Sequence, residues 1–331
     1  MMKLSASFRL LPLATLLAGA GAAAALALTG PANHAAAEMN LHRLPDDQAP
    51  VADAPAGAQW FDTEWGWIVV AHADDAPEAA EDIRAAIAAF YRYFGRRPAP
   101  GAVVQTDFAG LYPALRTAGA AWQTTWPFGR ARVPSDPGHH ADRRSALRHE
   151  IAHMLFLSLF IPNTRKNQYG GDAPDWLDEA AAMMAETPSA TEARRARFAD
   201  AVRAGRVPAF RVLIAETHPL FGAPEVQHAL AASGGAGTAP VVLALSPEEA
   251  GVSGEAIADF YAIARGMADY LIDRSGDERI LARIAMLIAE RHDARIWLDK
   301  LCADGALPVA PEAIDADFAA WSAARAADEE R

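Results

Sequence analysis

Two histidines and a glutamate stand close together in the segment His149-Glu150-Ile151-Ala152-His153. Residues four apart lie one turn above each other on the same face of an α-helix, so both imidazoles can reach one metal ion. Glu150 projects beside them, where it can accept a proton from water that the ion activates. The pattern predicts a hydrolytic zinc site with His149 and His153 as ligands and Glu150 as general base.

A five-residue motif of this kind also arises by chance, and the alternative is a pair of core histidines bonded to backbone carbonyls. The surrounding residues favour the metal site, because apolar side chains gather near one side of the same helix and can bury it, leaving both histidines to face a cleft. These apolar residues are Leu147, Ile151, Met154 and Leu155.

A zinc hydrolase needs a third protein ligand and an open fourth position. The extended histidine pattern of the metzincins is excluded, because Phe156 and Leu159 stand where it needs Gly and His. Downstream, Pro174 opens a second amphipathic helix, with Glu179 in its first or second turn. By itself, an acidic residue at this position is also what the helix dipole favours.

The segment from Trp176 to Glu179 resembles the Trp-Leu-x-Glu segment of the gluzincins, the thermolysin-like metallopeptidases, and in particular their small exported peptidase MA-like domains. In that family the Glu is the third ligand, so the resemblance implies one Zn²⁺ per chain, bound by His149, His153 and Glu179. The sequence departs from the family at Ala180, where Gly is usual.

The resemblance also implies an α+β, zincin-like fold, with a small N-terminal mixed sheet, an active-site helix and a mostly helical C-terminal lobe. Residues 259–276 resemble the family's later helix, from which a Tyr or His donates a hydrogen bond to the oxyanion in related enzymes. Tyr261 is the candidate, with His218 and His228 as alternatives. A tyrosine packed in the core with its hydroxyl at the rim is the competing interpretation.

Residues 121–128 lie where the family has an edge strand along the substrate cleft, and such an edge offers free backbone groups to an extended peptide. Trp122 and Trp126 are candidates for subsite walls, although tryptophans at alternate strand positions are more often core. The acidic or Gly-rich motif of gluzincin aminopeptidases does not occur in this segment, which favours an endopeptidase acting on peptides or proteins.

Ligand histidines usually donate their second ring N–H to a carboxylate or carbonyl. Asp178 and Glu186 are candidate partners. His139 and His140 lie in a Pro/Gly-rich loop and are expected to be exposed to solvent and not to bind the metal.

The periodicity of apolar residues, together with the Gly and Pro residues that end each segment, predicts a strand followed by a helix and then a mostly helical chain. Asp142 is the expected N-cap of the motif helix, and residues 231–254 are expected to form a surface loop or a cover over the site. The expected strands are 64–71, 101–106 and 121–128, and the expected helices are 77–94, 142–160 and one from Pro174.

The N-terminus has the layout of a secretory signal, with Lys3 and Arg9 before the apolar segment 10–28 and an Ala-x-Ala site ending at Ala37. We therefore expect an exported protein, periplasmic or secreted. The alternative is an uncleaved membrane anchor through residues 10–28, as in a membrane-anchored accessory protein.

The expected domain organisation is a leader at 1–37, a linker at 38–58 and a catalytic domain at 59–325. Within that domain we expect a sheet-containing lobe at 59–160 and a helical lobe at 161–325. Cys302 is the single cysteine, so an intrachain disulfide is excluded.

The net charge of −12, without any block of Lys and Arg, argues against a nucleic-acid partner. The alternative function is a catalytically inactive gluzincin-like protein that acts as a binding or scaffold protein of the cell envelope. Glu150 argues against it, because a site kept only for structure needs the ligands but not the base.

Overall fold

The computed structural model describes residues 41–51, 54–126, 137–161, 173–224, 226, 228, 251–291 and 296–329, without the side chains of 46, 137–142 and 291. The expected leader or anchor at 1–37 lies outside these residues, as does nearly all of the expected loop at 231–254. No described helix is both long and apolar enough to span a membrane.

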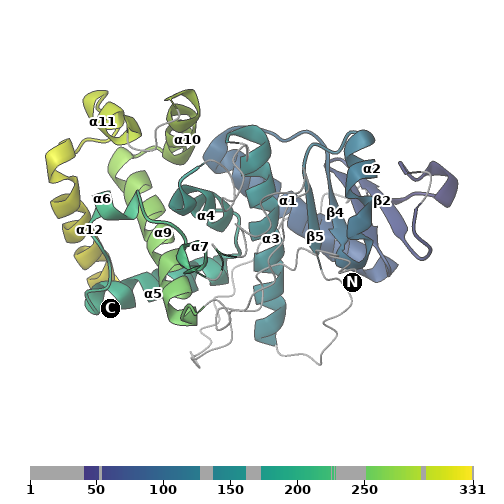
Figure 1. The fold of residues 1–331 in the computed structure, drawn as a ribbon, viewed down its shortest axis with the longest axis horizontal. Helices are drawn as coiled ribbons and strands as arrows, with labels where there is room; N and C mark the ends of the chain where they lie inside the picture. The colour runs from purple at the N-terminus through teal and green to yellow at the C-terminus, as the bar shows by residue number, and fades with distance from the viewer. Residues whose placement is uncertain are drawn as a thin grey trace, which may run out of the picture.

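The fold is α+β, as expected, with a small mixed sheet followed by helices (Figure 1). The strand order in the sheet follows the order in the chain, with antiparallel pairs β1–β2 and β2–β3 and parallel pairs β3–β4 and β4–β5. The strands are β1 His42–Arg43, β2 Gln59–Thr63, β3 Gly66–Val70, β4 Gly101–Gln105 and β5 Gln123–Trp126.

The three expected strands appear in shorter form as β3, β4 and β5, whereas β1 and β2 were not expected. Part of the expected linker therefore belongs to the sheet: His42 pairs with Asp62, and Arg43 with Phe61. Leu44 and Val51 pack against the buried side chains of the sheet. A two-residue strand has no detectable period, so β1 leaves no signal in the sequence.

Helices are the other regular elements of the described chain. The α-helices are α1 Ala76–Phe94, α2 Tyr112–Thr117, α3 Pro137–Leu159, α4 Asp175–Met183, α5 Pro188–Arg203, α6 Phe210–Leu213, α7 Pro219–Gly222, α9 Gly254–Ser275, α10 Ile280–Arg291, α11 Ile296–Ala303 and α12 Ile314–Asp328. The 3₁₀ helices are η1 Asp46–Gln48, η2 Ala73–Asp75, η3 Thr106–Leu111 and η4 Pro311–Ala313.

Two helix predictions can be compared directly with these bounds. The helix at 77–94 is confirmed as α1, which ends where Gly95 takes a left-handed φ of 68°. The motif helix α3, in contrast, begins at Pro137 and not after Asp142. Proline suits the first turn of a helix because it lacks the N–H that has no partner there, so the Pro/Gly/His segment starts the helix and does not precede it.

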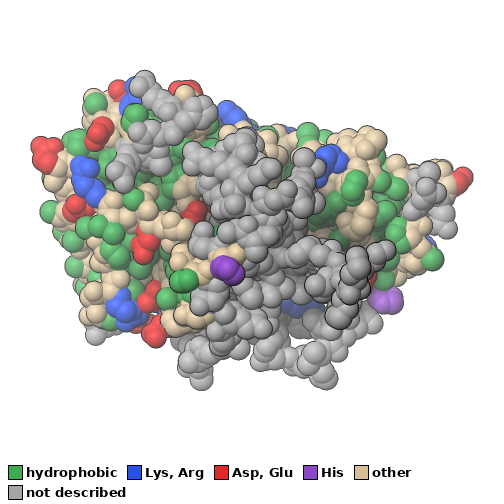
Figure 2. Space-filling view, viewed as in Figure 1, with side chains coloured by type: hydrophobic (Ala, Val, Ile, Leu, Met, Phe, Trp, Pro, Cys, Tyr) green, Lys and Arg blue, Asp and Glu red, His purple; other side chains and the backbone are tan. Residues whose placement is uncertain are grey.

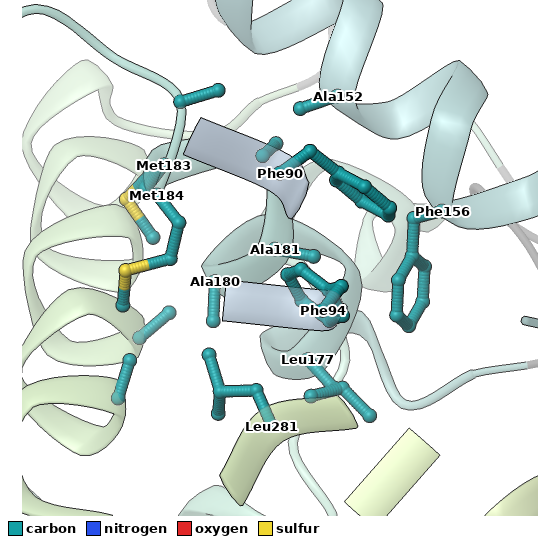
Figure 3. Packing of buried hydrophobic residues seen from close by; sticks show 14 of the residues in the cluster. Phe90, Phe94, Ala152, Phe156, Leu177, Ala180, Ala181, Met183, Met184 and Leu281 are labelled. Atoms are coloured by element: carbon teal, nitrogen blue, oxygen red, sulfur yellow. The ribbon is translucent and has the colours of Figure 1, made fainter. Parts of the chain in front are cut away.

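Helices α3 and α4 lie between the sheet and the C-terminal helices (Figure 1). Every residue of α4 is buried. Figure 3 shows α4 side chains such as Leu177 and Ala181 packed near Phe90 and Phe94 of α1 and Phe156 of α3. The helix that carries Glu179 is therefore held inside the main hydrophobic core.

The motif helix is also tied to α1 by charge. The buried carboxylate of Asp82 accepts hydrogen bonds at Oδ1 from Arg144 Nε at 3.0 Å and Arg148 Nε at 2.8 Å. Arg144 and Arg148 are four residues apart on α3, so one carboxylate holds two successive turns. This contact fixes the rotation of α3 just before His149.

We predict that Asp82→Ala lowers the free energy of unfolding by about 2–3 kcal/mol, because two partly buried guanidinium groups lose their partner. Urea denaturation measures the change. The matched control is Glu81→Ala, which removes only an exposed partner of Arg144 and is expected to cost less than about 1 kcal/mol. Equal losses in the two variants would contradict the anchoring role of Asp82.

Candidate metal centre

His149 and His153 lie on the inner side of α3 and are 8% and 7% exposed. The apolar positions chosen from the sequence are buried or, for Met154, partly buried, so the expected packing face is confirmed, but the histidines that were expected to face a cleft are buried as well. Both imidazoles therefore face the interior between α3 and α4.

Glu179, the fifth residue of α4, meets both histidines and is fully buried. Its Oε2 lies 3.2 Å from His149 Nε2 and 3.5 Å from His153 Nε2, and the two Nε2 atoms are 3.0 Å apart. One ligand atom from each of the three residues thus points at one small volume. This buried group could hold a metal ion.

Each histidine uses its other ring nitrogen to contact a carboxylate. His149 Nδ1 lies 3.0 Å from Glu186 Oε1, and His153 Nδ1 lies 2.9 Å from Asp178 Oδ1. The two candidate partners named from the sequence are therefore the observed ones. With a proton on Nδ1 donated to the carboxylate, each ring presents Nε2 toward Glu179.

Glu186 is in turn held by a cation that sequence analysis did not identify. Arg194 of α5 binds it with both arms, from Nη2 to Oε1 at 3.1 Å and from Nε to Oε2 at 3.4 Å. Burial alone would raise the pKa of Glu186, but the charge of Arg194 and the hydrogen bond with His149 lower it to about 2. Glu186 is therefore a carboxylate at neutral pH.

The charges at the three converging residues oppose the effect of burial. Burial favours a neutral Glu179, yet the neighbouring charge of His153 and a hydrogen bond with His149 hold the pKa of this carboxyl well below its usual value. Burial also favours neutral imidazole, but hydrogen bonds with Glu179 and Glu186 raise the pKa of His149 to about 9. The site is thus built to hold positive charge.

Glu150 follows His149 on α3 and is half-exposed. Tyr112, at the start of α2, was not singled out from the sequence, but it lies close enough to feel the charge of Glu150. Burial raises the pKa of Tyr112, a hydrogen bond with Thr125 of β5 opposes this, and the negative charge of Glu150 adds to it. Glu150 therefore lies within electrostatic range of Tyr112.

Tyr261 lies beside His149, and His218 lies beside Tyr261. The ring centroid of Tyr261 is 6.0 Å from that of His149 and 5.5 Å from that of His218. His218 is buried, and its Nδ1 accepts a hydrogen bond from the Leu220 N–H at 3.3 Å. His228, the other alternative, is exposed.

Backbone contacts also tie His218 to the helix that carries Glu179. The N–H of His218 donates to Asp175 Oδ2 at 2.6 Å. Burial lowers the pKa of His218, so its ring is neutral at pH 7. The side chains of His139 and His140 lie outside the described residues.

The segment before α3 forms β5, which is last in the order of the described sheet. Trp122 and Trp126 are 4% and 2% exposed and belong to the main core. The structure therefore supports their interpretation as core residues and not as subsite walls.

Comparison with protein-family models, with curated proteins and with solved structures gives no match, so the function of the site is inferred from its own geometry.

On the described part of the face in Figure 2, acidic and basic side chains are interspersed, without one continuous basic patch.

We predict that metal binding at this site displaces a proton. Two Nε2 atoms 3.0 Å apart need one donor and one acceptor, so with both Nδ1 atoms protonated one ring is an imidazolium. Neighbouring carboxylates raise the pKa of both rings, that of His149 to about 9, so the pair keeps this proton at pH 7 and holds it less tightly as the pH approaches 9.

A metal ion needs the neutral ring, so about one proton is released per ion at pH 7 and the apparent affinity rises as the pH increases toward 9. Calorimetric titration with a divalent metal ion, in buffers of different ionisation enthalpy, measures the release. An affinity that stays constant between pH 7 and pH 9 would refute the prediction.

Proposed function

We propose that this protein is a zinc-dependent metallopeptidase of the gluzincin type, with a zincin-like fold, that cleaves peptide bonds outside the cytoplasm. The observation that carries the proposal is the convergence of His149, His153 and Glu179 in a buried site, next to the half-exposed carboxylate of Glu150.

The spacing of the ligand atoms supports zinc as the ion. Tetrahedral zinc with nitrogen and oxygen ligands at about 2.0–2.1 Å needs these atoms roughly 3.3 Å apart. The three separations among His149 Nε2, His153 Nε2 and Glu179 Oε2 are 3.0, 3.2 and 3.5 Å. Two imidazoles and one carboxylate are also the protein ligands of thermolysin-type catalytic zinc.

When bound, zinc supplies a Lewis acid that polarises the scissile carbonyl and brings the pKa of water toward ~7. Glu150 takes a proton from the attacking water and returns it to the leaving amine. Tyr261 of α9, whose ring centroid lies 6.0 Å from that of His149, is the candidate that donates a hydrogen bond from its hydroxyl to the carbonyl oxygen as this oxygen gains negative charge.

The position of β5 supports a peptide substrate. It is the last strand of the described sheet, and an extended peptide that added to its outer edge would bind through backbone hydrogen bonds. The lack of the aminopeptidase motif in the sequence of residues 121–128 adds the expectation of endopeptidase action. The signal layout at 1–37 adds export to the periplasm or the medium, or attachment to the membrane through residues 10–28.

We predict that the native chain, purified without a polyhistidine tag, contains about one zinc ion and that Glu179→Ala contains much less, because a carboxylate ligand is lost. Mass spectrometry of the metal content measures both proteins. The absence of zinc from the native protein, even after zinc is supplied, would refute the hydrolase proposal.

We predict that Glu150→Gln keeps its zinc but loses about 10²- to 10⁴-fold in turnover, because the amide cannot accept the proton. Cleavage of a fluorogenic peptide library measures the loss. Glu192→Gln, at an exposed position of α5, is the matched control and is expected to keep full activity. A native protein that binds zinc but cleaves no peptide would favour the inactive binding or scaffold alternative.

A further inference from the structure

Arg194 lies at the centre of a set of contacts around the metal centre. Its side chain is 14% exposed, and both arms of its guanidinium hold Glu186. The Oε1 atom that Arg194 Nη2 approaches at 3.1 Å also lies 3.0 Å from His149 Nδ1. One carboxylate oxygen thus joins the cation to the imidazole.

The same guanidinium also contacts Tyr261. Its central carbon lies 4.8 Å from the centre of the Tyr261 ring, within the distance of a cation–π interaction. The Tyr261 ring is in turn 6.0 Å from the His149 ring. Arg194, Glu186, His149 and Tyr261 therefore form a closed set of contacts on α3, α5, α9 and the turn after α4.

The neighbouring Arg195 shows what a purely structural arginine in α5 looks like. Arg195 also binds a carboxylate with both arms, that of Asp269 on α9, at 2.7 and 3.1 Å. This pair joins α5 to α9, but no described contact links it to His149 or Tyr261. The two neighbouring arginines thus form similar ion pairs, and only the pair of Arg194 reaches a candidate ligand.

We propose that Arg194 is a positioning residue of the metal centre, which fixes the His149 ring through Glu186 and the Tyr261 ring through direct contact. This inference rests on the proposed metal site. A bidentate guanidinium restricts the Glu186 carboxylate to one orientation, and that orientation sets the direction in which His149 presents Nε2. The planar cation packed on the face of the Tyr261 ring restricts the movement of this side chain and holds the ring beside His149.

The test uses Co²⁺ as the probe, because its visible absorption reports ligand geometry whether or not the protein is active. Affinity and spectrum are compared for the native chain, Arg194→Met, Arg194→Lys and the matched control Arg195→Met. We expect about 10-fold weaker Co²⁺ binding and an altered spectrum for Arg194→Met, at the lower end of the usual effect of groups that orient metal ligands. Arg195→Met is expected to keep the native affinity and spectrum.

The path through Glu186 is tested by a double-mutant cycle with Glu186→Gln. If Arg194 acts through Glu186, Arg194→Met changes the Co²⁺ affinity much less in the Glu186→Gln protein than in the native protein. If Arg194→Met does not fold, Arg194→Lys decides, since a single ammonium cannot hold both carboxylate oxygens and is expected to shift the Co²⁺ spectrum.

Native affinity and spectrum in the Arg194 variants, or an equal loss in Arg195→Met, would overturn the inference and leave the metal site intact. Failure of the native chain and of all variants to bind Co²⁺ would overturn the metal site and this inference together.

Discussion

The burial of the Glu179 carboxylate is the constraint on which the rest of the site depends. A buried carboxylate without partners is costly, and burial alone would drive it to the neutral form. The two imidazoles of α3 provide the compensation, so α4 must pack against α3 at the turn that carries them. That requirement is met because α4 is buried along its whole length and its other residues are mostly apolar.

The imidazoles need partners of their own, which extends the site outward. Asp178 and Glu186 accept from the two Nδ1 atoms, and Arg194 balances the charge of Glu186. From Glu179 outward, the imidazoles, their carboxylate partners and Arg194 each orient and balance the charge of the group next to them. The result is a rigid set of inward-facing acceptors in a site that stabilises a cation.

The surrounding fold supplies two further restraints on this arrangement. Asp82 holds α3 against α1 on the sheet side, and Arg265 of α9 donates to the carbonyl oxygen of Met183 at the end of α4. The two helices that carry the candidate ligands are therefore held from both sides. Glu150, by contrast, stays half-exposed, which suits the general base proposed above, because such a group exchanges protons with water.

The sequence by itself determined the features that depend on local spacing: a helix with His149 and His153 on one face, Glu150 beside them, and Glu179 early in the following helix. The i, i+4 geometry of a helix is the same in any fold, so these relations need no tertiary information. Only the tertiary structure decided that Glu179 meets both histidines and that Arg194 and Tyr261 join them. These side chains come from α3, α4, α5 and α9, and packing between distant segments leaves no periodic signal in the chain. The same reason explains why β1 could not be foreseen, because a two-residue strand exists only through its pairing with β2.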